Sequence, residues 1–204
     1  MREKFPMRLT RLIVLAIAGA LPVLVLLGFC VGSPRYYSAK YSPAPGLLAP
    51  ADLPSAIVPE TQDEPHTCGL HSLRSVYRAY GVDPDIARLR FRLGVDRPAT
   101  NFDPESLGAI HPDIVRVARQ DGFDAAIVPT GGPEALPTIR AHLESGHPAL
   151  VLVRVNSLHW LVLAALDGDG VIIADSLAEQ PYREPLDTYV RDRVLSAILL
   201  RPRE

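Results

Sequence analysis

Three short apolar runs in the last third of the chain constrain its fold more than any other feature. They span Ala149–Val155, His159–Leu166 and Val171–Asp175, and their lengths favour strands. The sequence Asp167-Gly168-Asp169-Gly170 separates the last two, and Asp-Gly between apolar runs is a strong β-hairpin signal. This part of the chain is therefore predicted to form an antiparallel sheet.

Helical patterns precede these strands. Apolar residues recur at helical spacing from Cys68 to Tyr80, and Gly81 follows as a cap. Further helices are predicted at Asp85–Leu93, Pro112–Gln120 and Pro133–Glu144, with a short strand at Phe123–Val128. A helix at about Pro185–Arg191 and a strand at Val194–Leu200 end the pattern. Helices followed by an antiparallel sheet indicate an α+β domain.

An uncharged apolar segment, Leu12–Val31, is long enough to cross a bilayer as a helix. Basic residues precede it at Arg2, Lys4, Arg8 and Arg11. By the positive-inside rule, the N-terminus stays in the cytoplasm and the rest is exported. Two alternatives remain open, a cleaved signal peptide and a lipoprotein signal that ends at Cys30.

The chain thus divides into four parts: a cytoplasmic N-terminus at 1–11, a transmembrane signal-anchor helix at 12–31, a proline-rich linker at 32–56 and a domain at 57–204. The expected location is the cell membrane, with a single pass and the domain on the extracytoplasmic side. Secretion and lipid anchoring are the alternatives. A net charge of −2 gives no basic footprint, so we expect no nucleic-acid partner. The sequence does not predict an oligomeric state.

Cys68 is the one cysteine of the predicted domain, because Cys30 lies in the apolar segment. A thiol without a disulfide partner in an exported domain suggests reactivity. Its place at the start of a helix favours the thiolate, since the helix dipole and free N–H groups stabilise negative charge there. The alternative is a small buried hydrophobic residue.

His159 and Asp175 supply a base and an orienting carboxylate on the predicted hairpin. If the turn centres on Gly168, position 159 faces position 177, and Asp175 is its diagonal neighbour on the same face. A shift of one residue would place the two on opposite faces, so this geometry requires an odd-length or bulged loop. Asp175 would then bind one imidazole nitrogen and leave the other for the Cys68 thiolate.

Gln62 lies six residues before Cys68. Its side-chain amide is a candidate donor to the oxyanion of a tetrahedral intermediate, together with the backbone N–H of Cys68. A zinc site built from His66, Cys68, His71 and His159 is a weaker alternative, since no second cysteine or CxxC pair supports it. We expect no metal and no cofactor.

The spacing from Gln62 to Cys68-Gly69, the helix ending Tyr77-Arg78-Ala79-Tyr80-Gly81 and the later His159 and Asp175 resemble the family-39 cysteine peptidases. These papain-like enzymes remove double-glycine leader peptides from bacteriocins. The resemblance covers roughly residues 57 to 202. It implies a papain-like fold with N-terminal helices packed on a C-terminal antiparallel sheet.

The resemblance also implies roles: Cys68 as nucleophile, His159 as base, Asp175 as orienting group and Gln62 as oxyanion donor. Three residues depart from the family's usual pattern. Thr67 stands where an acidic residue is common, His71 where a small residue is usual, and Ser176 where proline usually follows the aspartate.

The sequence therefore predicts a membrane-tethered exported cysteine peptidase that acts on a peptide or protein substrate. Two alternatives share its features. One is a peptide-binding module of the same fold without catalysis, and the other is a thiol acyltransferase of the transglutaminase type.

Overall fold

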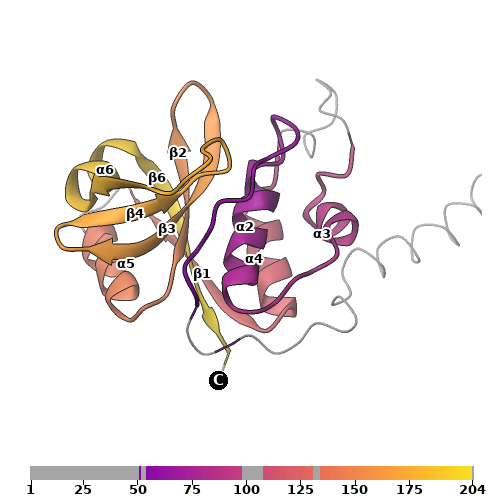
Figure 1. Ribbon diagram of the computed structural model, residues 1–204, viewed down its shortest axis with the longest axis horizontal. Coiled ribbons are helices and arrows are strands. Elements are labelled where there is room, and N and C mark those ends of the chain that lie inside the picture. The colour runs from indigo at the N-terminus through magenta and orange to yellow at the C-terminus, as the bar shows by residue number, and fades with distance from the viewer. Residues whose placement is uncertain (1–50, 52–53, 98–107, 131–133, 204) are drawn as a thin grey trace, which may run out of the picture. The chain divides into compact units, whose positions relative to one another are not determined.

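A six-stranded antiparallel sheet lies between two layers of helices in the computed structural model of the chain (Figure 1). The strand order is β1-β6-β2-β3-β4-β5. Every neighbouring pair of strands is antiparallel. The strands are β1 (Phe123–Pro129), β2 (Ala149–Arg154), β3 (Leu158–Asp167), β4 (Gly170–Ala174), β5 (Tyr182–Pro185) and β6 (Val194–Pro202).

The structure describes residues 51, 54–97, 108–130 and 134–203. The predicted parts 1–11 and 12–31, and all of the linker 32–56 except 51 and 54–56, lie outside these residues. Among the described residues, no helix combines the length and the apolar character that crossing a bilayer requires.

Helices cover both faces of the sheet. On one side lie α2 (Cys68–Ala79), α3 (Ile86–Leu93) and α4 (His111–Gln120), and on the other lie α5 (Ala135–Glu144) and α6 (Leu186–Arg193) (Figure 1). Each face has its own hydrophobic core, so successive strand residues are buried in alternate cores. In β2, for example, Leu150 packs with α2 and α4, while Val151 and Val153 pack with α5 and α6. Strands covered on both faces read as continuous apolar runs, as β2 does here.

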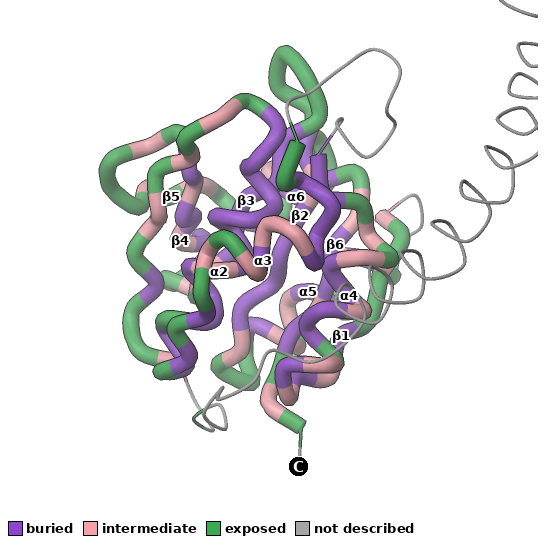
Figure 2. Tube along the Cα trace, turned by 90° about the vertical axis from the view of Figure 1, so that its right-hand side faces the viewer, coloured by how far each residue is buried: buried purple, intermediate pink, exposed green. Residues whose placement is uncertain are grey.

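Burial follows the inner strands and the inward sides of the helices, and the exposed residues lie mainly in the connections (Figure 2). Burial against the sheet explains the helical spacing of apolar residues in α2, since Leu70, Leu73 and Val76 are completely buried there.

A buried ion pair joins the helices of the first layer. Arg92 of α3 donates from Nη1 to Asp121 Oδ2 at 2.9 Å, and its Nη2 lies 2.8 Å from Oδ1. Tyr77 of α2 donates its hydroxyl to the same carboxylate at 3.1 Å. Removing one partner of a fully buried pair costs about 3–5 kcal/mol. This cluster therefore fixes α2 relative to α3 and the end of α4.

The α+β class and the antiparallel sheet are as predicted, and the predicted helices and strands of the domain agree with the structure to within about two residues at most ends. One strand was missed. Residues Tyr182–Pro185 form the edge strand β5, although this short polar segment ends in a proline and has no apolar run.

Candidate active site

Cys68 is the first residue of α2 and is only 5% exposed. Its Sγ accepts a hydrogen bond from the backbone N–H of Trp160 in β3 at 3.5 Å. Gly69 permits this close approach of helix and strand. A Cβ at Gly69 would lie 2.9 Å from Ala109 Cβ, a distance that real Cβ atoms essentially never show. It would also lie 3.0 Å from Trp160 Cδ1, which is tighter than most real Cβ contacts.

Trp160 fixes the start of β3 against α2. Its indole Nε1 donates to the Ala109 carbonyl at 2.9 Å, and its own carbonyl accepts from Ser72 Oγ of α2 at 3.0 Å. The residue before it is His159, so these contacts also set the position of the histidine backbone near Cys68.

His159 and Asp175 are hydrogen-bonded. His159 Nε2 lies 2.7 Å from Asp175 Oδ1, and both side chains are largely buried. The Leu177 backbone N–H donates to the same carboxylate oxygen at 2.9 Å. With Nε2 occupied, Nδ1 is the ring nitrogen left for the Cys68 thiol.

A β-bulge makes this pairing possible. The two-residue turn pairs Asp167 with Gly170, and that register alone would put positions 159 and 175 on opposite faces. A register shift between Leu163 and Ala165 moves the pairing by one residue, so that Val162 pairs with Ala174. Continued past Ala174, the shifted register places Asp175 diagonal to His159 on one face. The prediction that a bulged or odd-length hairpin is needed is confirmed.

The surroundings of His159 favour its cation. Burial by itself lowers the pKa of His159, but hydrogen bonds to Asp175 and to Cys68 outweigh it and raise the pKa to about 9. Burial likewise acts to raise the pKa of Asp175, and the hydrogen bonds from His159 and Leu177 outweigh it, so the carboxyl pKa is lowered. Near neutral pH the pair is therefore an imidazolium and a carboxylate.

Gln62 is held next to this pair by Ser176. Its backbone N–H donates to the Ser176 carbonyl at 3.0 Å, and its side-chain Oε1 accepts from Ser176 Oγ at 2.8 Å. Its amide Nε2 donates to the Glu64 carbonyl at 3.1 Å, which occupies one of the two amide hydrogens.

A cleft of about 490 Å³ lies at this end of the sheet, lined by the segment before α2 and by the β2–β3 connection. Gln62, His159 and Asp175 all line it, and Cys68 adjoins it through His159. Its other lining residues are Asp63, Glu64, Pro65, Val155, Asn156, Ser157, Leu158 and Leu177. The four residues predicted from the sequence thus meet at one end of the sheet.

Tyr182 is a neighbour of the site that the sequence did not indicate. It hydrogen-bonds to the Asp175 carboxylate and helps to lower the pKa of that group. Its strand, β5, was itself missed, so nothing placed it beside Asp175. The sequence Tyr-Arg-Glu-Pro carries no apolar–polar alternation that would reveal the strand, although its residues alternate between partly buried and exposed in the structure.

The three residues that depart from the family pattern all contact the segment that carries Gln62. Thr67 Oγ1 lies 2.8 Å from the Glu64 carbonyl and 3.1 Å from Asp63 Oδ1. His71 contacts Glu60 and Asp63, and Ser176 bonds Gln62. His71 is thus engaged by carboxylates rather than grouped with His66 and Cys68 as the zinc alternative required.

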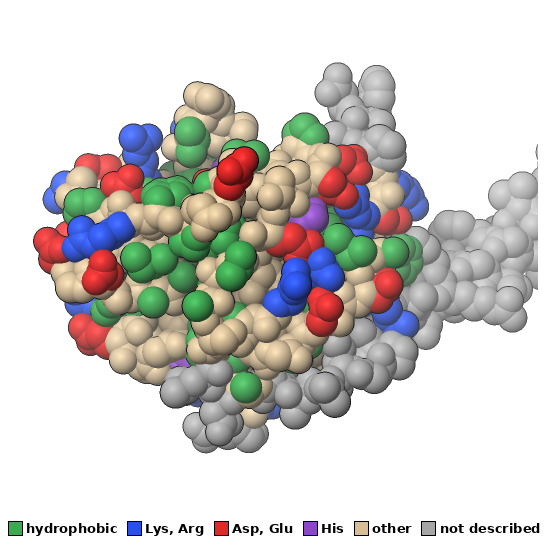
Figure 3. Space-filling view, in the orientation of Figure 1, with side chains coloured by type: hydrophobic (Ala, Val, Ile, Leu, Met, Phe, Trp, Pro, Cys, Tyr) green, Lys and Arg blue, Asp and Glu red, His purple; other side chains and the backbone are tan. Residues whose placement is uncertain are grey.

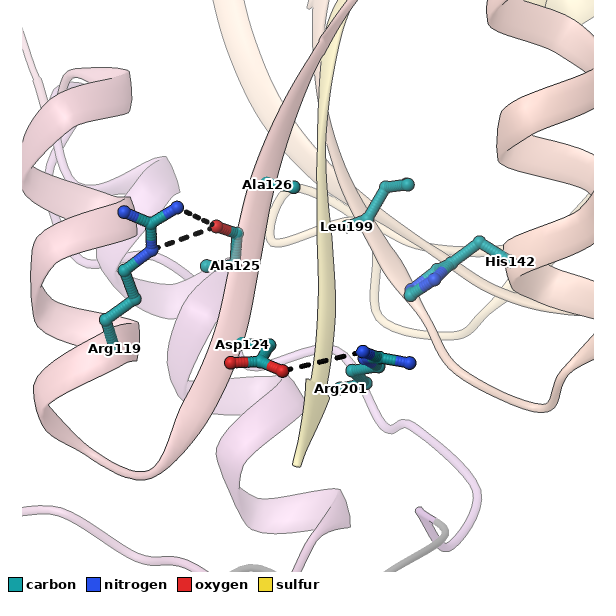
Figure 4. A pocket seen from close by; sticks show the side chains of 7 residues that line it. All are labelled: Arg119, Asp124, Ala125, Ala126, His142, Leu199 and Arg201. Atoms are coloured by element: carbon teal, nitrogen blue, oxygen red, sulfur yellow. Dashed lines mark hydrogen bonds and ion pairs between the residues drawn. The ribbon is translucent and has the colours of Figure 1, made fainter. Parts of the chain in front are cut away.

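A second cavity, of about 500 Å³, lies beside β1 and β6 (Figure 4). Its polar groups already have partners within the protein. Arg119 donates to the Ala125 carbonyl, and Asp124 pairs with Arg201 at 3.6 Å. No nucleophile lies among its lining residues, whereas His159 in the first cleft contacts Cys68. The cleft at His159 is therefore the candidate active site.

Three solved structures of peptidase domains share this fold. The peptidase domain of Streptococcus ComA, a bi-functional ABC transporter, has a TM-score of 0.54 and 22% identity, over 71% of this chain and 97% of that one. A double glycine motif protease from an AMS/PCAT transporter, solved with its leader peptide, has a TM-score of 0.53 and 22% identity, over 76% and 99%. A protein from Bacillus anthracis described as a C39-like peptidase has a TM-score of 0.53 and 16% identity, over 75% and 100%.

These neighbours are peptidase domains of the kind that the sequence resemblance indicated, and what they share with this chain is the fold. No protein-family model and no curated protein sequence matches the chain.

Proposed function

We propose that this chain is a cysteine peptidase that hydrolyses a peptide bond through an acyl-enzyme on Cys68. The observation that carries the proposal is the row of contacts from Cys68 through His159 to Asp175 beside an open cleft. A thiol next to an imidazolium that a carboxylate orients is the arrangement of an activated cysteine nucleophile. The shared fold with peptidase domains supports this reading.

The proposed reaction has two halves. The Cys68 thiolate attacks the scissile carbonyl carbon, and the oxyanion accepts hydrogen bonds from the Cys68 backbone N–H and the second amide N–H of Gln62. His159 then gives its proton to the leaving amine, and the C–N bond breaks. Water, deprotonated by His159, attacks the acyl-enzyme and releases the carboxylate product. One oxyanion donor typically contributes about 10²–10³ in rate.

The cleft favours a peptide with apolar side chains as the substrate. Val155, Leu158 and Leu177 line it and are 62%, 56% and 68% exposed. Exposed apolar side chains around a cleft are typical of a binding surface. One structural neighbour binds a leader peptide, and we propose a peptide or protein segment for this chain too.

We also propose that the domain is tethered to the membrane. The support is the uncharged segment Leu12–Val31 with basic residues before it, which together predict a signal anchor. The cleft would then work on the extracytoplasmic side.

Alkylation of the thiol tests the proposed chemistry. At about pH 6, well below the ordinary thiol pKa of about 8.5, iodoacetamide should modify Cys68 faster than a free cysteine. His159→Ala should remove that advantage, and His147→Ala, remote from the cleft, should keep it. If Cys68 reacts no faster than free cysteine and His159→Ala changes nothing, the peptidase proposal fails in favour of a binding module. Acyl transfer to added amines in preference to water would favour the transferase.

A further inference from the structure

His71 lies one helical turn after Cys68 and is enclosed by two carboxylates. Its Nδ1 is 3.1 Å from Glu60 Oε1, and its Nε2 is 3.1 Å from Asp63 Oδ1. The side chain is 3% exposed. Glu60 and Asp63 stand on either side of Gln62 in the chain, so one ring bridges the two sides of that residue.

The geometry requires a charged ring. An ionised carboxylate only accepts hydrogen bonds, so both ring nitrogens must donate, and only the imidazolium has two N–H groups. Burial by itself lowers the pKa of His71, but the hydrogen bonds to Glu60 and Asp63 outweigh it and raise the pKa. Burial acts to raise the pKa of Asp63, but the hydrogen bonds from His71 and Thr67 and the charge of Arg90 outweigh it and lower that pKa to about 2.

Two arginines extend the network to the helices. Arg74 of α2 donates to Glu60, and Arg90 of α3 donates to Asp63 and to Glu64. Charged side chains of both signs and a histidine adjoin over the helical half of the face in Figure 3. The other charged neighbours of the cluster are Arg78 and Asp83. Backbone contacts add to it, since the Glu60 N–H donates to Ser75 Oγ at 3.0 Å.

The segment that bears Gln62 is therefore held from both the sheet and the helices. Ser176 binds Gln62 itself from the sheet side, and His71 binds both flanking carboxylates from α2. Because α2 also presents Cys68, the His71 bridge ties the proposed oxyanion donor to the helix that carries the nucleophile.

We propose that His71 is a positioning residue: its cationic ring holds Glu60 and Asp63 so that the Gln62 amide lies where the oxyanion forms. This inference rests on the proposed peptidase function. His71 does not line the cleft, and it acts through Gln62.

A double-mutant cycle tests the inference. His71→Gln should lower kcat about 10- to 100-fold with little change in KM, because small misplacements of a catalytic group cost rates of that order. Gln62→Ala should lower kcat about 10²–10³-fold. The double variant should be no slower than Gln62→Ala. If the two losses multiply, or if His71→Gln keeps the full rate, the inference is overturned.

Matched controls separate positioning from damage. Alkylation of Cys68 by iodoacetamide forms no oxyanion, so His71→Gln should keep its rate. His147→Gln makes the same change at a histidine that bonds Tyr80 away from the cleft, and it should leave kcat unchanged. If His71→Gln does not fold, Asp63→Asn breaks the bridge from its exposed side, and the same cycle with Gln62→Ala applies.

Hydrogen exchange, which does not depend on catalysis, tests this inference separately from the proposed function. The backbone N–H of Gln62 donates to the Ser176 carbonyl, so the hydrogen exchange of this backbone amide reports the order of the segment. Exchange should be at least about tenfold faster in His71→Gln than in wild type, because the segment opens more often. Unchanged exchange overturns the inference even if the enzyme is active. Faster exchange in a chain without peptidase activity would support the bridge and refute only the function.

Discussion

At the residue scale, the charge of His159 decides what the cleft can do. The proposed active form pairs a Cys68 thiolate with the His159 imidazolium, and that form needs His159 protonated. Asp175 accepts from the ring at 2.7 Å and is itself fixed by the Leu177 N–H and by Tyr182. The carboxylate therefore both orients the ring and stabilises its charge.

Asp175→Asn should move the alkaline limit of activity. Activity should fall as the pH rises through the His159 pKa of about 9, since the imidazolium is lost there. Without the carboxylate, that pKa should fall toward its ordinary 6.5, so the limit should shift to lower pH. We also expect kcat/KM to fall about 100-fold or more, as for other triads with a mispositioned base. The pH–rate profile measures both.

Asp124→Asn is the matched control for that change. Asp124 pairs with Arg201 and Arg203 at the opposite edge of the sheet. Its removal should leave the pH profile in place. An unshifted alkaline limit in Asp175→Asn would contradict the role given to Asp175.

The candidate catalytic residues could largely be predicted from the sequence, but the residues that position them could not. Cys68 and Gln62 lie in one short sequence segment. The Asp-Gly-Asp-Gly turn predicts the hairpin that brings His159 and Asp175 together. His71 was predicted as a departure from the family or as part of a zinc alternative. Its real partners, Glu60 and Asp63, lie in a segment without periodicity, and their convergence on one ring depends on how that segment folds over α2.

At the element scale, the site depends on how closely α2 approaches β3. Gly69 allows that approach, and the bulge in the β3–β4 hairpin supplies the register. The bulge was expected only as a condition for the pairing of His159 with Asp175. Hairpin sequence does not fix a bulge, because packing on both faces of β3 and β4 decides where the extra residue goes.

Gly69→Ala should destabilise the fold and disturb Cys68. The added Cβ would crowd Ala109 and Trp160, and overpacking typically costs about 1–3 kcal/mol. The higher helix propensity of alanine offsets up to about 1 kcal/mol of that loss. Urea unfolding should show the net decrease, and iodoacetamide should modify Cys68 more slowly.

Ala109→Gly provides the matched rescue. It removes the nearer of the two clashing groups, so the combined variant should recover part of the stability lost in Gly69→Ala. Equal stabilities of wild type and Gly69→Ala would show that α2 can move away from β3 at no cost.

At the scale of the whole molecule, the described domain is one sheet with two cores, and the site lies at one end of it. The cellular location of the domain therefore depends on the segment before residue 51. Its location is a prediction from sequence alone, because residues 1–50 lie outside the described part of the chain.

Fractionation of cells tests the tether. The full chain should sediment with membranes, and a variant that lacks residues 1–31 should be soluble. A membrane-impermeant maleimide should label Cys68 in intact spheroplasts, with Cys68→Ala as the control for Cys30. Labelling that requires lysis would contradict the extracytoplasmic orientation.

The place of β6 has a consequence for the order of assembly. Although it comes after all the other described strands, β6 lies inside the sheet, between β1 and β2. When the chain emerges with its N-terminal end first, β1 cannot pair with β6 until residues 194–202 have emerged. Until then both hydrophobic cores lack the side chains that β6 contributes to them. The sheet can therefore close only after residues 194–202 have emerged, so both hydrophobic cores are completed after every other described strand is available.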